Sequence, residues 1–169
     1  MDAGGRTLKV RHLKPSLVAL LRNKPAAIVV DPQGGSPRST PFSLVKLLLW
    51  LAEEWCANLF QDNKNIVLLC DRYYHDLLID WKRYRYGGPL WVARLVGNLM
   101  PRPRLWILLD APAEVFQARK QEVPAEETVR QRLAYLAFVR KQQRYIVVDA
   151  SQSLDRVIAY VAKAIMENV

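Results

Sequence analysis

The chain has few cysteines and no long uninterrupted hydrophobic run. Only Cys56 and Cys70 occur among its 169 residues, and no secretory segment accompanies them, which excludes a disulfide-stapled secreted scaffold. The apolar run 42–51 is interrupted by Ser43 and Lys46 and is too short to span a bilayer. The first residues lack the apolar core of a signal peptide. We therefore expect a cytoplasmic protein with reduced core thiols and no membrane partner.

Acidic residues are also scarce relative to basic ones. Sixteen Asp and Glu face 25 Lys and Arg, which gives a formal net charge of +9 and favours anionic partners such as phosphates or nucleic acid. The cations gather mostly in predicted loops and helix ends. This placement suits a phosphate-binding cleft, although a solvated basic surface is the alternative. The length and the 51% hydrophobic content predict one domain, residues 1–169, with a substantial core.

Apolar blocks of strand length alternate with helical patterns, which predicts an α/β fold with a parallel sheet. We expect strands at 65–70, 105–110 and 145–149, and a weaker one at 26–31. All four end in or just before an Asp, as expected if their carboxyl ends line one polar crevice. The expected architecture is a three-layer αβα arrangement.

The longest predicted helix begins at Ser39 or Thr40 as its cap and continues towards Phe60. Its middle, residues 47–51, is apolar on nearly every side, which predicts burial between layers or against something that this chain does not contain. Further helices are expected at 90–99, 113–121, 125–141 and 154–167.

The segment after the first clear strand carries the most informative motif, Asp71-Arg72-Tyr73-Tyr74-His75-Asp76. An Arg just beyond a buried strand can offer its planar fork to a phosphate, and Asp71 could hold a magnesium-bound water or orient Arg72. Here the sequence resembles the thymidylate kinase family, in which an Asp-Arg-Tyr motif lies beside the nucleoside monophosphate. The resemblance implies that Arg72 binds the acceptor phosphate, with Tyr73 and Tyr74 as further substrate contacts. An ordinary strand-end salt bridge is the alternative interpretation.

A second match follows the strand at 105–110. Asp110, Pro112 and Glu114 resemble the family's strand and helix that lead into its lid, and Pro and Glu suit the first turn of a helix. The resemblance implies that Arg119 and Lys120 neutralise charge on the transferring phosphates, with Arg119 catalytic. Two further lid candidates, for which a solvated helix face is the alternative, are Arg130 and Arg132.

The turn at 31–38 is similar to a third segment of the family, whose usual form is Arg-Glu-Pro-Gly-Gly-Thr-Pro. Asp31 stands for the Glu and Gln33 is inserted. The resemblance implies that Asp31 contacts metal or substrate and that Arg38 reaches a phosphate. A plain turn ahead of a capped helix fits the same residues.

Residues 81–89 interleave cations with aromatic side chains, a composition that proteins use to stack bases and hold phosphates. Nucleic acid is therefore a secondary candidate partner. The same composition borders the acceptor site in thymidylate-kinase-like domains, so this segment does not discriminate between the two interpretations.

The resemblance covers about 26–165 and implies a P-loop NTPase-like fold that uses ATP with Mg²⁺ to phosphorylate a nucleoside monophosphate. No G-x-x-x-x-G-K-[ST] phosphate loop occurs in the 169 residues. We therefore expect a domain truncated at its N-terminus, without the family's first strand and phosphate loop, and inactive as an isolated chain. A complementary N-terminal polypeptide or a second copy would be a possible partner. The alternative is a non-catalytic module that binds a nucleotide, nucleic acid or a protein.

Overall fold

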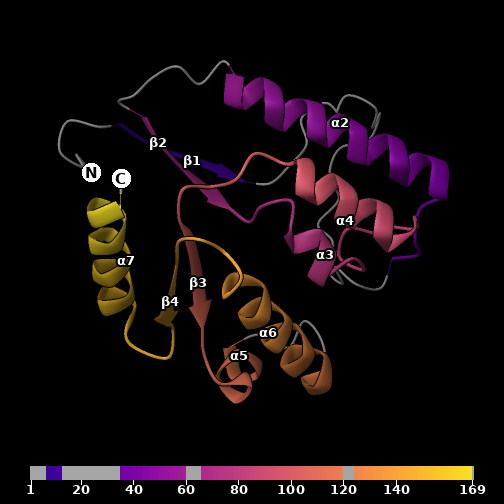
Figure 1. Cartoon of the computed structure of the whole chain (residues 1–169). Coiled ribbons are helices and arrows are strands. Elements are labelled where there is room, and N and C mark those ends of the chain that lie inside the picture. The colour runs from indigo at the N-terminus through magenta and orange to yellow at the C-terminus, as the bar shows by residue number, and fades with distance from the viewer. Residues whose placement is uncertain (1–6, 13–34, 60–65, 120–123, 169) are drawn as a thin grey trace. The chain divides into compact units, whose positions relative to one another are not determined.

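The computed structural model describes residues 7–12, 35–59, 66–119 and 124–168. The chain forms two compact units, a first unit of Met1–Pro101 and a second unit of Arg102–Val169, and each is described here by itself (Figure 1). The described part of each unit is a two-stranded parallel sheet with helices. This confirms a mixed α/β fold with parallel strand pairing, whereas the three-layer arrangement and the single domain stay predictions.

The described part of the first unit contains two strands and three helices, labelled in Figure 1. In chain order they are β1 (Thr7–His12), α2 (Thr40–Leu59), β2 (Ile66–Asp71), α3 (Asp76–Ile79) and α4 (Leu90–Leu99). The predicted strand at 65–70 and the predicted helices at 39–60 and 90–99 match β2, α2 and α4 to within one residue at each end. The weaker strand predicted at 26–31 lies outside the described residues.

Strand β1 was not among the strands predicted from the sequence. It pairs with β2 in parallel, from Thr7 opposite Ile66 to His12 opposite Asp71. Its sequence alternates apolar residues with Lys9 and Arg11, and Val10 is 58% exposed, so its apolar signal is weak. The strand forms because β2 supplies backbone hydrogen-bond partners that the local sequence does not reveal.

Helix α2 buries a single stripe rather than its whole circumference. The buried positions are Ser43, Leu47, Trp50 and Glu54, spaced by three or four residues as on one helix face. Leu48, in the middle of the apolar run, is 61% exposed. Burial of this helix on every side is therefore not found within the described residues of the first unit.

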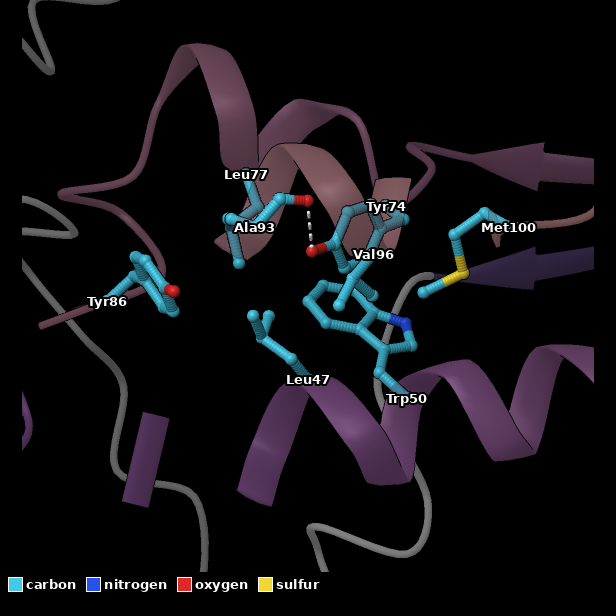
Figure 2. Packing of buried hydrophobic residues seen from close by; sticks show 8 residues of the cluster. All are labelled: Leu47, Trp50, Tyr74, Leu77, Tyr86, Ala93, Val96 and Met100. Carbon is cyan, nitrogen blue, oxygen red and sulfur yellow. Dashed lines mark hydrogen bonds between the residues drawn. The ribbon is translucent and has the colours of Figure 1, made fainter. Parts of the chain in front are cut away.

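The core of the first unit gathers where α2 meets α4 and the segment after β2, as Figure 2 shows. Trp50 of α2 meets Tyr74 edge to face at 5.3 Å, and the Tyr74 hydroxyl donates to the Ala93 carbonyl of α4 at 2.9 Å. A buried tyrosine needs such an acceptor for its hydroxyl. The buried members of this cluster are Leu47, Trp50, Tyr74, Leu77, Tyr86, Ala93, Val96 and Met100.

The described part of the second unit contains two strands and three helices, in the order β3 (Trp106–Asp110), α5 (Ala113–Arg119), α6 (Ala125–Val139), β4 (Tyr145–Asp149) and α7 (Leu154–Asn168). The predicted strands at 105–110 and 145–149 match β3 and β4. The two strands pair in parallel and end side by side, with Asp110 opposite Asp149. Two of the aspartates expected at the carboxyl ends of strands therefore meet at one sheet edge.

In the part of the chain that the structure describes, no helix combines the length and apolarity needed to cross a bilayer.

Two adjacent leucines on α2 provide a test of this core. Leu47 is 1% exposed and Leu48 is 61% exposed. We expect Leu47→Ala to lower the free energy of unfolding by about 3 kcal/mol, because it leaves a cavity against Trp50 and Tyr74. Leu48→Ala should change it by no more than about 0.5 kcal/mol. Urea unfolding of both variants measures the difference, and equal losses would contradict the packing described here.

Candidate active site

The candidate site begins where β2 ends. Asp71 closes the strand and is exposed, and Arg72 follows it with a positive φ of 69°. For a residue other than glycine, this left-handed backbone conformation costs roughly 1–3 kcal/mol. Such strained residues are found most often at functional sites. Arg72 is thus placed at the carboxyl end of a parallel strand, as the sequence predicted, in a backbone conformation that the sequence did not predict.

The Arg72 side chain is tied to the first residue of α3. Its Nη1 donates to Oδ2 of Asp76 at 3.1 Å, and the Tyr84 hydroxyl donates to the same oxygen at 2.6 Å. Asp76 is 9% exposed, so its charge lies in a poorly solvated place where pairing is required. We call these three residues, Arg72, Asp76 and Tyr84, the Asp76 cluster.

Tyr84 is itself held by α2. Its ring lies 5.7 Å from that of Trp50, and Nζ of Lys46 donates to the Tyr84 carbonyl at 3.3 Å while lying 5.6 Å from the Tyr84 ring. Burial, followed by the nearby Asp76 carboxylate, raises the pKa of the Tyr84 hydroxyl well above its usual range. The hydroxyl therefore keeps its proton and stays a hydrogen-bond donor.

A second loop reaches the same segment from the N-terminal side of α2. The backbone N–H of Arg38 donates to the Arg85 carbonyl at 2.9 Å, and the Thr40 hydroxyl donates to the Gly87 carbonyl at 2.9 Å. A Cβ at Gly87 would lie 1.9 Å from the Arg38 carbonyl oxygen, so glycine is required for this approach. The Arg38 guanidinium lies 5.1 Å from the Phe42 ring.

The structure thus connects two predicted phosphate ligands through one segment, residues 84–87. Arg72 contacts it through Asp76 and Tyr84, and Arg38 contacts it through Arg85. Both arginines are exposed. Nothing in the sequence indicated this connection, because the contacts that hold the segment to α2 join residues 38 to 47 positions apart.

The two predicted tyrosine contacts differ in their surroundings. Tyr73 is partly buried, its hydroxyl donates to the Pro101 carbonyl at 2.6 Å, and its ring stacks near His75. Tyr74 is fully buried in the core described above. This placement corrects its predicted role, because a ring with no exposed surface offers no face to a substrate. Asp31 lies outside the described residues.

The aromatic residues in 81–89 are mostly committed to packing. Tyr86 is 3% exposed and its hydroxyl donates to the Pro89 carbonyl at 3.0 Å, while Tyr84 belongs to the Asp76 cluster. Trp81 is partly buried and carries Lys82 5.8 Å from its ring. The composition that suggested base stacking is therefore explained in large part by the core.

In the second unit, Arg132 on α6 reaches the end of β3. Its Nε and Nη2 donate to the two carboxylate oxygens of Asp110 at 2.7 and 2.9 Å. The side chains of Arg132 and Asp110 are 33% and 16% exposed. This two-point contact has the geometry that guanidinium groups also use for phosphate, and it fixes the middle of α6 to the end of β3.

The other predicted lid residues are at separate places on the second unit. Arg119 is exposed at the last position of α5, and Arg130 makes a two-point contact with Glu127 of its own helix at 2.6 Å. Lys120 lies outside the described residues. A groove of about 540 Å³ runs between β4 and α7, and none of the predicted site residues that the structure describes lines it.

The sequence analysis placed Asp76 in its leading motif and Tyr84 in an aromatic segment, but it did not predict that they hold Arg72, and it did not identify Lys46 as a member of the site. The four-residue spacing between Arg72 and Asp76, opposite in charge at the start of a helix, is the one signal that could have revealed Asp76. No comparable signal existed for Tyr84 or Lys46, whose contacts are long-range.

The raised pKa values of the buried tyrosines generate a prediction about alkaline stability. Burial is the main cause for Tyr73, Tyr74, Tyr84 and Tyr86. Because these pKa values are raised on folding, their contribution to stability is fully present below pH about 10 and is lost as the pH rises above it. We expect the free energy of unfolding to fall above pH about 10, measured by urea unfolding, with tyrosinate absorbance appearing together with unfolding.

The variant Tyr84→Phe provides the control for this effect. It removes one of the four ionising groups, so it should lose less stability across the same pH step. A free energy of unfolding that stays constant across pH about 10, or an equal loss in the variant, would contradict the role of these buried hydroxyls.

Comparison with known proteins gives one distant similarity and no family profile. A probable thymidylate kinase 1 of Saccharolobus solfataricus is 28% identical over 116 residues, which cover 61% of this chain and 56% of the relative. No protein-family profile matches the chain. The chain thus spans little more than half the length of this relative. The name of this relative agrees with the family that the motif at Asp71 and Arg72 resembles.

Proposed function

We propose that this chain is a thymidylate-kinase-like protein that binds the phosphate of a nucleoside monophosphate through Arg72. The observation that carries the proposal is the placement of Arg72 at the carboxyl end of β2, with a left-handed backbone and its guanidinium held by Asp76. The distant similarity to a probable thymidylate kinase supports the same substrate class. We propose Arg38, whose loop contacts the segment next to Tyr84, as a second phosphate ligand.

Arginine suits this role because its planar guanidinium matches the oxygens of a phosphate and stays charged at every physiological pH. The segment that anchors Arg72 is packed on the core of the first unit, so the guanidinium is presented from a fixed base. Binding then loses less conformational entropy than it would with a freely rotating side chain. Tyr73, partly buried beside Arg72, remains a candidate contact for the nucleoside.

The family resemblance implies MgATP as the phosphoryl donor. Among the described residues, no group of three or more His, Cys, Asp or Glu side chains could hold a metal ion. Such a cluster is not required, because Mg²⁺ is commonly held by one or two carboxylates together with substrate phosphates. Asp71, exposed at the end of β2, fits that single-carboxylate role. When bound, the ion would neutralise charge on the phosphates.

On the donor side we propose Arg119, with Lys120, Arg130 and Arg132 as further cations. Two of them already have carboxylate partners, Glu127 for Arg130 and Asp110 for Arg132. For these two, a role in phosphate binding requires exchange of a carboxylate for a phosphate. Arg119 lies at the exposed end of α5, and it could bind a phosphate without breaking either of these two ion pairs.

We further propose that the 169-residue chain binds a nucleotide without transferring phosphate. A phosphate loop supplies backbone donors, a lysine and a hydroxyl ligand for Mg²⁺, which do most of the positioning and charge stabilisation in phosphoryl transfer. The sequence contains no such loop. A second polypeptide or a longer form of the protein would have to provide these groups for catalysis.

The acceptor site is tested by replacing Arg72. We expect Arg72→Ala to weaken binding of thymidine monophosphate by about tenfold or more, because a charge-assisted contact to phosphate is lost. Isothermal titration calorimetry measures the dissociation constants. Arg94→Ala is the matched control, since it removes an exposed arginine of α4 with the same change in net charge.

Equal effects of the two substitutions would mean that Arg72 acts only through bulk charge, and the proposed site would be rejected. Binding that is strongly salt-dependent, favours single-stranded nucleic acid and shows no preference for mononucleotides would instead favour the non-catalytic binding module.

Phosphoryl transfer is tested separately with the pure chain. We expect no measurable formation of nucleoside diphosphate from ATP and thymidine monophosphate, for lack of the phosphate-loop groups. An assay of diphosphate formation with chromatographic separation measures this. Diphosphate formation that is lost in Arg72→Ala would show that the chain carries catalytic groups other than those of a phosphate loop.

A further inference from the structure

The Asp76 carboxylate is shared between a predicted phosphate ligand and the core. One oxygen, Oδ2, accepts from Arg72 Nη1 at 3.1 Å and from the Tyr84 hydroxyl at 2.6 Å. The side chain of Arg72 is 38% exposed and that of Asp76 is 9% exposed. The contact therefore runs from the surface, where a ligand would bind, to a buried anchor.

This arrangement restricts the Arg72 guanidinium more than a surface ion pair does. An exposed pair between two long side chains has little preferred geometry. Here the acceptor is a short, buried carboxylate, and a second hydrogen bond from Tyr84 holds that carboxylate in place. Because the guanidinium is planar, restricting one of its nitrogens restricts the orientation of the whole fork.

Tyr84 in turn is held in place by contacts with α2, in addition to its hydrogen bond to Asp76. Its ring packs near Trp50, a residue that is 1% exposed, and its carbonyl accepts from Lys46. The backbone of Arg72 has its own constraint in the left-handed region. Arg72 is therefore fixed at the backbone by local conformation and at the side chain by a path that leads to the core.

We propose that Asp76, held by Tyr84, is a positioning residue that orients the Arg72 guanidinium for the acceptor phosphate. This inference rests on the proposed function, and it assigns the two residues a role that neither the motif nor the comparison implies. A negative carboxylate beside a phosphate ligand would otherwise oppose anion binding. Asp76 favours binding because the gain from orientation exceeds this repulsion.

The test compares two tyrosines of the same segment. Tyr84→Phe removes the hydroxyl that holds Asp76, and Tyr86→Phe removes a hydroxyl that donates to the Pro89 carbonyl, outside the Asp76 cluster. Partners that orient a binding group typically contribute about 10- to 100-fold to affinity in metal sites. We expect Tyr84→Phe to weaken thymidine monophosphate binding by about tenfold and Tyr86→Phe to leave it within about twofold.

A second readout requires no ligand. Nuclear magnetic resonance of the arginine guanidinium nitrogens reports the rotation of the Arg72 Nη groups, with the signal assigned by its loss in Arg72→Lys. We expect slow rotation in the unaltered chain and in Tyr86→Phe, and faster rotation in Tyr84→Phe. Equal rotation in the two phenylalanine variants would overturn the proposal.

Asp76→Asn provides an independent check, because it keeps an oxygen acceptor but removes the charge that holds Arg72. Positioning predicts weaker binding and faster Arg72 rotation. If Asp76 merely opposed the phosphate, binding would tighten, and the proposal would fail. This variant also serves if Tyr84→Phe does not fold, which circular dichroism shows.

The outcomes separate this inference from the proposed function. If the unaltered chain binds no nucleoside monophosphate, the proposed function fails, and the rotation of Arg72 still decides whether Asp76 and Tyr84 hold it. If the unaltered chain binds, but neither Tyr84→Phe nor Asp76→Asn alters affinity or rotation, the function stands and the positioning role is rejected.

Discussion

The candidate site of the first unit depends on one buried carboxylate. A charge with little solvent must be paired, and Asp76 meets this requirement with the Arg72 guanidinium and the Tyr84 hydroxyl. Along the chain these two donors lie on either side of α3, one just after β2 and the other in the segment that leads to α4. The pairing therefore joins strand, helix and loop at the place where a ligand would bind.

Arginine–carboxylate pairing recurs across the described residues and changes how the basic composition is understood. Arg11 of β1 donates to Glu54, which is buried on α2, and Arg132 of α6 holds Asp110 at the end of β3. Each pair links two elements within its own unit. Part of the arginine content is thus committed to internal contacts, so the count of 25 Lys and Arg overstates the number of cations that are available to anionic ligands.

Secondary structure was largely predictable because its signals are local. Strands β2, β3 and β4 are short apolar runs, and the prolines at positions 41, 89 and 124 lie at helix starts, where a missing N–H costs little. Strand β1 was missed because its alternating Lys9 and Arg11 resemble a polar segment, and only pairing with β2 makes it a strand. The buried stripe of α2 was likewise hidden within a run that is apolar all round. The position of Arg72 after a strand was predictable because it is a local feature of the sequence. Its contacts were not predictable, because Tyr84 and Lys46 approach through tertiary packing. Tyr74 was misassigned for a related reason: a motif gives residue order, and burial decides which side chains face outward.

The close approach at Gly87 limits how this protein can vary. The glycine backbone lies so near the Arg38 carbonyl oxygen that no side chain fits between them, which couples one position in the segment before α4 to the loop ahead of α2. The two stretches cannot diverge independently during evolution, because a larger residue at 87 demands a rearranged loop at 35–38. A library that randomises position 87 alone would therefore lose most of its members to this single contact.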